Sequence, residues 1–168
     1  IGGSAPVSAL TITSDQLTAG AIKLNGALTA TLGGSSTISG VIANGASAAN
    51  LVKAGNGTLT LSASNTYTGT TAINAGDLTV SGSLHDSTAV SIASGADYNV
   101  NASDTVASIE GAGNIVLASS QTLTAGDANN KTLSGVISGA GNYIKAGSGI
   151  QTLSASNTYT GTTQVSAG

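Results

Sequence analysis

Few residues in this chain have side chains that could carry out chemistry. His85 is the only histidine, and it is followed directly by Asp86 and Ser87. A histidine close to an aspartate and a serine could belong to a Ser-His-Asp arrangement for nucleophilic catalysis. Serine and threonine, however, fill 24 and 23 of the 168 positions, so a serine near any histidine is expected by chance. We therefore interpret residues 83–87 as a polar loop and predict no catalytic residue.

The carboxylates are the second candidate for chemistry. They are Asp15, Asp77, Asp86, Asp97, Asp104, Asp127 and Glu110. A glycosidase needs two carboxylates across a cleft, and a β-helical lyase would need a carboxylate cluster beside a basic residue. No two of the seven lie within a few positions of each other, and arginine is absent. A polysaccharide-acting β-helix enzyme stays an alternative only if stacking brings distant carboxylates together.

The sequence offers no signature of a metal or cofactor site. Cysteine is absent, which excludes thiolate ligands and disulfides. The Gly-Gly-x-Gly-x-Asp repeats and the EF-hand spacing of calcium sites are also missing. The glycine-rich stretch 135–141 is not followed by Lys-Ser or Lys-Thr, so it does not match a phosphate-binding loop. We predict that no metal ion and no cofactor is bound.

The positive charges are four lysines, which form no basic run and predict no nucleic-acid partner. No window approaches the roughly 18 apolar residues of a membrane helix, so membrane insertion is not expected. Lys53 and Lys145 follow Val52 and Ile144, which we expect to point inward. The two lysines are therefore expected at the surface as solubilising residues. The alternative is a basic row along one edge.

The apolar residues, which must position any site, come in short packets with a period of two. Leu59–Thr60–Leu61, Leu78–Thr79–Val80 and Val90–Ser91–Ile92 are examples. Such alternation places aliphatic side chains on one face of a strand and hydroxyls on the other. Glycine, asparagine and serine separate the packets and favour turns. No window keeps a helical period, so the sequence predicts an all-β chain.

A long internal repeat relates residues 38–76 to residues 133–168. Its core, Leu61–Thr71, recurs without change as Leu153–Thr163. Repeated short strands with variable loops are typical of stacked, quasi-one-dimensional folds. An antiparallel sandwich would also fit the strand spacing, but the absence of bulky core aromatics favours a narrow cross-section. We predict one right-handed parallel β-helix over residues 1–168, with three strands in each of about 7–8 rungs.

Threonine pairs raise a further alternative, an ice-binding solenoid. Thr-x-Thr occurs at 11–13, 29–31, 58–60, 66–68 and 122–124. An ice-binding face requires one such pair on every rung at constant spacing, and these starting positions are irregular. We interpret the pairs as ordinary outward hydroxyls on strands.

The second repeat copy departs from the first at the start of one strand. Thr58 and Leu59 are replaced by Ile150 and Gln151. If Leu153 points inward as Leu61 does, strict alternation turns Ile150 outward and Gln151 inward. Because a one-residue slip reverses every side chain, we expect a bulge or an adjusted turn near Gly149.

Residues 55–78 resemble the repeat of autotransporter passenger domains, Gly-x-Gly-Thr-Leu-x-Leu-Ser-Gly-x-Asn-Thr-Tyr-x-Gly-x-Thr, which ends in Gly-x-Leu. Residues 147–168 carry a second copy that stops before the final leucine, and Ala63 and Ala155 replace a usual glycine. The resemblance implies a fragment of a longer passenger, exported through the outer membrane of a Gram-negative bacterium to the cell surface. It further implies a stalk or adhesin. The scarcity of titratable side chains predicts that the segment is non-catalytic, and its many outward hydroxyls and amides suit other copies of itself, glycans or host surface molecules as partners.

Overall fold

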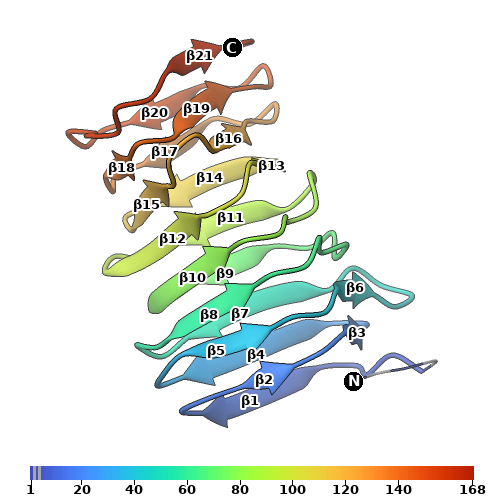
Figure 1. The fold of residues 1–168 in the computed structure, drawn as a ribbon. Helices are drawn as coiled ribbons and strands as arrows, with labels where there is room; N and C mark the ends of the chain where they lie inside the picture. Colours follow the sequence, from blue (N-terminus) through green and yellow to red (C-terminus); the bar gives the residue numbers. More distant parts are fainter. Residues whose placement is uncertain (2, 4) are drawn as a thin grey trace.

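The computed structural model describes Ile1, Gly3 and residues 5–168 and is a rod of short strands (Figure 1). Its turns are stacked from β1 to β21, with the two termini at opposite ends of the stack. The described residues form strands, turns and loops but no helix, so they include no helix suited to crossing a membrane. The all-β prediction is therefore confirmed.

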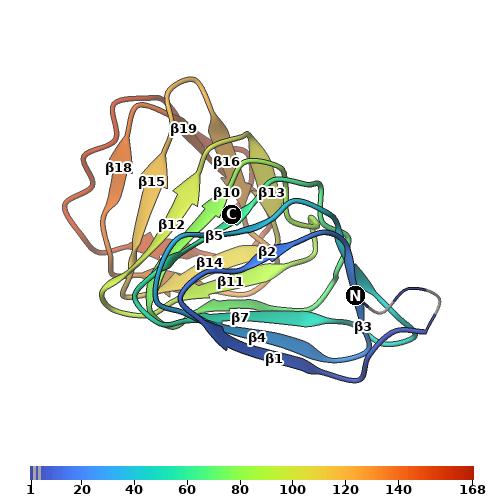
Figure 2. The same ribbon diagram turned by 60° about the horizontal axis from the view of Figure 1, so that its bottom comes forward.

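Three faces surround the interior of the rod (Figure 2). The eight-stranded sheet contains β1 (Leu10–Ser14), β4 (Ala27–Leu32), β7 (Asn50–Ala54), β9 (Thr71–Ile73), β11 (Ala89–Ile92), β14 (Ser108–Gly111), β17 (Lys131–Leu133) and β20 (Gln151–Leu153). The seven-stranded sheet contains β2 (Thr18–Ala19), β5 (Ser36–Ile38), β8 (Thr58–Leu61), β10 (Gly76–Val80), β12 (Ala96–Val100), β15 (Asn114–Leu117) and β18 (Ile137–Gly139). The third face contains β3 (Ile22–Leu24), β6 (Ile42–Asn44), β13 (Asp104–Val106), β16 (Thr122–Ala125), β19 (Asn142–Lys145) and β21 (Thr163–Val165).

All strand pairings in the described chain are parallel, and each joins equivalent strands of neighbouring turns. In the seven-stranded sheet, for example, β10 lies between β8 and β12, and both pairings are parallel. An antiparallel sandwich is thereby excluded. The eight strands of the longest sheet give one strand per turn, so the fold is a parallel β-helix of eight turns.

The core is a set of columns in which equivalent inward side chains stack from turn to turn. Leu59 pairs with Leu78, Leu78 with Tyr98 and Tyr98 with Ile115, and all four side chains are buried. Parallel neighbours lie about 4.8 Å apart, so each inward side chain contacts its counterparts above and below. The alternation seen in the sequence therefore becomes a continuous apolar interior.

Side chains replace strand pairing on the third face between β6 and β13. We number the turns by the strands of the eight-stranded sheet, so the third and fourth turns begin with β7 and β9. In the described chain these two turns contribute no strand to the third face, and Ser64 and Ser83 form an isolated bridge there. Asn65 Oδ1 accepts a hydrogen bond from Ile42 N at 2.9 Å, while its Nδ2 donates to the carbonyl of Ser83 at 3.0 Å. Asn65 is thus a buried cap, a role that sequence analysis missed.

The two repeat copies occupy different faces of the rod. Strand β8 of the first copy belongs to the seven-stranded sheet, whereas β20 of the second belongs to the eight-stranded sheet. Turn length varies along the chain, because the step from Leu10 to its partner Leu28 is shorter than the step from Thr29 to its partner Val52. The same repeat sequence therefore serves on two faces.

The departure in the second copy is absorbed before the strand. Ile150 is 60% exposed and Gln151, the first residue of β20, is half-buried, as alternation predicted. Pairing is one-to-one from Gln151 to Leu153. Relative to the repeat, β20 therefore begins one residue later than β8. The adjustment lies in the loop before the strand rather than in a bulge.

The expectation that Lys53 and Lys145 lie at the surface is wrong. Lys53 is fully buried, pointing to the same side of β7 as Leu51, whereas Val52 is half-buried. Its Nζ donates to three backbone carbonyls, those of Ala54 at 3.0 Å, Gly55 at 2.8 Å and Ala75 at 3.0 Å. The ammonium group therefore joins the corner after β7 to the corresponding corner of the next turn.

Lys145 repeats this arrangement in the second copy. It is 7% exposed, and its Nζ donates to the carbonyls of Ala146, Gly147 and Ala167. The glycine two residues after each lysine has a positive φ, 74° at Gly55 and 65° at Gly147. A β-carbon at Gly55 would collide with the carbonyl oxygen of Leu32, so this corner requires glycine. The two lysines form structural corners and not a basic row.

Burial lowers the pKa of Lys53 from its ordinary value, and the charge of Asp77 opposes that shift. Three carbonyl partners offset the cost of removing the ammonium group from water.

We predict that Leu59→Gln lowers the free energy of unfolding by about 3–5 kcal/mol, because it removes apolar contact and buries an amide without partners. Leu59 has no exposed surface, whereas its neighbour Thr60 points outward and is half-buried. Denaturant unfolding measures the difference, and Thr60→Gln is the control, with a change of less than about 0.5 kcal/mol. Equal effects of the two substitutions would contradict the assignment of inward and outward positions.

We also predict that Lys53→Met lowers the free energy of unfolding by about 2 kcal/mol, because buried carbonyls lose their donor while the methionine side chain fills the space. Lys23→Met, at an exposed position on β3, is the control. Thermal and denaturant unfolding of both variants provide the measurement. A Lys53→Met chain as stable as the parent would show that the ammonium group is dispensable at this corner.

Candidate binding face

The outward face of the seven-stranded sheet carries an unbroken row of small polar side chains. In register, this row runs through Thr18, Thr37, Thr60, Thr79 and Asn99. It spans five successive turns, from β2 to β12, at the strand spacing of about 4.8 Å. Val116 and then Ser138 continue it on β15 and β18. We call these first five residues the polar row.

A second row lies beside the polar row, nearer the start of each strand. It consists of Thr58, Asp77, Asp97 and Asn114, paired in register. The Thr58 hydroxyl donates to Asp77 Oδ2 at 3.1 Å, and Asn114 Nδ2 donates to Asp97 Oδ1 at 3.1 Å. Hydrogen bonds between neighbouring turns therefore orient these side chains along the face.

Aromatic side chains take little part in the outer surface. The expectation that the core lacks bulky aromatics is wrong: Tyr67, Tyr98 and Tyr143 are buried, and Tyr159 is half-buried. The hydroxyls of Tyr67 and Thr71 are hydrogen-bonded at 2.6 Å within the core. A ligand on the outer faces would therefore meet hydroxyls, amides and a few charges rather than aromatic rings.

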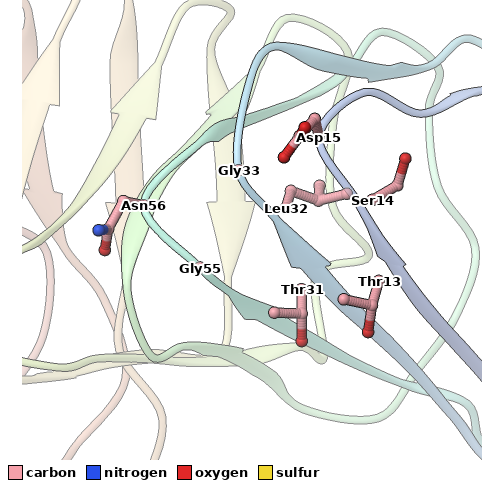
Figure 3. Close-up of a pocket in the computed structure, with 8 residues that line it drawn as sticks. All are labelled: Thr13, Ser14, Asp15, Thr31, Leu32, Gly33, Gly55 and Asn56. Atoms are coloured by element: carbon pink, nitrogen blue, oxygen red, sulfur yellow. The ribbon is translucent and has the colours of Figure 1, made fainter.

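A corner between the two large sheets is hollowed near the start of the chain (Figure 3). The hollow has a volume of about 530 Å³, and its lining includes Thr13, Thr31 and Asp15. Figure 3 shows Thr13 and Thr31 side by side at the ends of β1 and β4, with Asp15 beyond them. The hollow therefore adds hydroxyls and one carboxylate to the polar outer surface.

His85 forms hydrogen bonds within its own loop. Its Nδ1 lies 2.8 Å from the hydroxyl of Ser87 and accepts a hydrogen bond from Ser87 N at 3.2 Å. The carbonyl of His85 accepts a hydrogen bond from Thr88 N, which closes the turn. These contacts support the interpretation of this segment as a polar loop.

Two carboxylates line a second hollow, of about 270 Å³, on the third face. They belong to Asp86 and Asp104. This is the kind of pair that the enzymatic alternative needs, yet both oxygens of Asp104 accept hydrogen bonds from Leu84 N, at 3.2 and 3.1 Å. Elsewhere Glu110 pairs with Lys131 at 2.9 Å. The contacts of Asp104 thus connect turns of the rod and give it a structural role.

The threonine pairs stack on two turns only. The pair at 11–13 lies in register with the pair at 29–31, but the next turn presents Val52 and Ala54 at these positions. The pair at 58–60 lies on another sheet. The array needed for the ice-binding alternative is therefore interrupted.

The part of the chain that the structure describes contains no group of three or more His, Cys, Asp or Glu side chains placed to hold a metal ion. The predicted absence of catalytic, metal and cofactor residues stays a prediction.

Comparison with known proteins agrees with the repeat. The family model of the passenger-associated-transport-repeat matches residues 51–80 and 144–168. Over 128 residues the chain is 37% identical to the Adhesin BmaC autotransporter of Brucella suis biovar 1 (strain 1330). This match covers 70% of the chain but only 4% of the relative. No solved structure matches the chain significantly.

The two matches agree with the fold. The first matched segment contains β8 to β10, and the second contains β20 and β21, so each family repeat comprises consecutive strands of the β-helix. The chain is an autotransporter passenger segment, built as a parallel β-helix around two passenger-associated-transport repeats.

Proposed function

We propose that this segment acts without catalysis, as a stalk and adhesive surface within a longer passenger at the bacterial cell surface. Its partners would be further copies of itself, glycans or host surface molecules. The similarity to a protein named an adhesin supports this proposal, as does the elongated stack of turns. The observation that carries it is the polar row, five successive turns of outward threonine and asparagine.

The chemistry of the polar row favours weak, cumulative binding. A net hydrogen bond exchanged with water contributes only about 0.5–1.5 kcal/mol, so a single turn would bind poorly. Regularly spaced turns multiply such contacts, because the first contact raises the effective concentration of the rest. The formal net charge of −3 over 168 residues keeps repulsion between neighbouring rods small.

We predict that cells displaying the passenger with Thr37, Thr60 and Thr79 all changed to lysine aggregate less and bind host surfaces or glycans less than the parent. The three lysines place like charges on successive turns, so two such faces repel each other and lose the hydroxyl contacts. Sedimentation of displaying cells and binding to glycan-coated surfaces provide the measurements, with surface display quantified in parallel.

The matched control places the same three lysines on the eight-stranded sheet, at Thr11, Thr29 and Ser91. Both variants add three positive charges at outward positions. An equal loss in both would show that net charge matters and the polar row does not. Turnover of a polysaccharide by the purified segment would overturn the non-catalytic proposal, and unchanged adhesion in both variants would reduce the segment to a spacer.

A further inference from the structure

A carboxylate holds together the stretch of the third face where strand pairing is interrupted. Asp104, the first residue of β13, is 6% exposed. Leu84 N, in the preceding turn, donates to both of its oxygens, at 3.2 and 3.1 Å. Thr105 N donates to Oδ1 at 3.0 Å, and the hydroxyl of Tyr98 donates to Oδ2 at 3.2 Å. The side chain therefore supplies the acceptor that a neighbouring strand would otherwise offer to Leu84.

Asparagine does the corresponding work elsewhere in the rod. Asn65 Oδ1 accepts from Ile42 N at 2.9 Å, and Asn157 Oδ1 accepts from Ile137 N at 2.7 Å. An amide is neutral at every pH, whereas a carboxylate changes its charge on protonation. Asp104 is thus a titratable side chain in a role that the two repeat copies give to a neutral one.

The surroundings of Asp104 disfavour its charged form. Asp86, in the loop after Leu84, places a second negative charge nearby, and the phenols of Tyr98 and Tyr67 approach from the interior. The ion pair found in the described part of the chain joins Lys131 to Glu110 and leaves Asp104 without a cationic partner. Burial is the largest cause that raises the pKa of Asp104 from 3.8 to about 6, with the charge of Asp86 adding to it. The hydrogen bonds from Leu84, Tyr98 and Thr105 oppose the rise.

We propose that Asp104 is a pH-sensitive latch, a side chain that holds the fifth turn to the fourth and stabilises their contact more at mildly acidic pH than at neutral pH. In the neutral acid no charge is buried, while an oxygen still accepts from Leu84 N. In the carboxylate the same contacts must offset the burial of a charge beside Asp86.

The sign of the effect follows from proton linkage. The folded chain holds this proton up to about pH 6, whereas the unfolded chain releases it near 3.8. The stabilisation is therefore fully present below pH 3.8 and is lost as the pH rises through about 6. This is the reverse of the usual acid sensitivity of an aspartate held by a salt bridge.

The test is denaturant unfolding of the full 168-residue chain at pH 5 and pH 7. For the parent, the ratio of folded to unfolded chain should be about tenfold higher at pH 5 than at pH 7, after division by the corresponding change measured for Asp104→Asn. Asp104→Asn keeps an oxygen for Leu84 N and should lose this dependence. Asp127→Asn is the matched control: Asp127 is half-buried, and its pKa is lowered by a hydrogen bond from Asn129. Its titration therefore lies below the tested range, and the dependence of the parent should persist.

A transplanted latch gives a second, independent outcome. Asn157→Asp places a carboxylate at the equivalent cap in the last turn and should add a further preference for pH 5. Amide exchange of Leu84 reports on the latch locally and should show greater protection at pH 5 than at pH 7, after correction for intrinsic rates.

Equal pH dependence in the parent and in Asp104→Asn would overturn the proposal, as would a parent that is more stable at pH 7. If Asp104→Asn does not fold, the carboxyl carbon of Asp104 can be titrated by NMR in the parent chain. A midpoint near 6 supports the latch, and a midpoint near 4, the ordinary value for aspartate, overturns it.

Discussion

The stacking of each turn on the next, with equivalent residues in register, is the constraint on which this structure depends. Parallel strands about 4.8 Å apart bring every inward side chain against its counterparts, so a column such as Leu59, Leu78 and Tyr98 must stay apolar along its length. Outward residues need not be apolar, and they vary among threonine, asparagine, aspartate and valine. Gln151 is accommodated because it is the first residue of β20, the terminal strand of its sheet, so no further turn stacks on it in that sheet.

The corners are where this constraint is hardest to satisfy, because the chain turns there and leaves strand pairing behind. Buried backbone groups still require partners, and polar side chains supply them. Lys53 donates to carbonyls of two successive turns, while Asn65 and Asp104 accept from the amides of the turn before. Each of these side chains bonds to the backbone of a neighbouring turn, so each connects turns as well as completing a corner.

The division between interior and exterior also shapes what the rod can bind. The interior contains three of the four tyrosines and two of the four lysines, so the outer faces retain hydroxyls, amides and a few charges. Such surfaces bind through number and regular spacing rather than through one deep site. The polar row extends over five turns and suits an extended partner. The buried carboxylate of Asp104 acts in another way, on the cohesion of the turns themselves.

Alternation along the chain predicted the strands and the facing of Leu59, Ile150 and Gln151, because inward or outward orientation is a local property of an extended backbone. The parallel stack was predicted from the internal repeat. The polar row could be anticipated only as outward hydroxyls, since its alignment depends on turn lengths, which differ from one turn to the next. The same variation placed the two repeat copies on different faces. Lys53 and Lys145 were expected at the surface because each follows a residue, Val52 or Ile144, that was expected to point inward. A charge is also costly to bury alone. The carbonyls that make their burial possible include those of Ala75 and Ala167, which the next turn contributes. A partner so distant along the chain becomes a neighbour only when the turns are stacked.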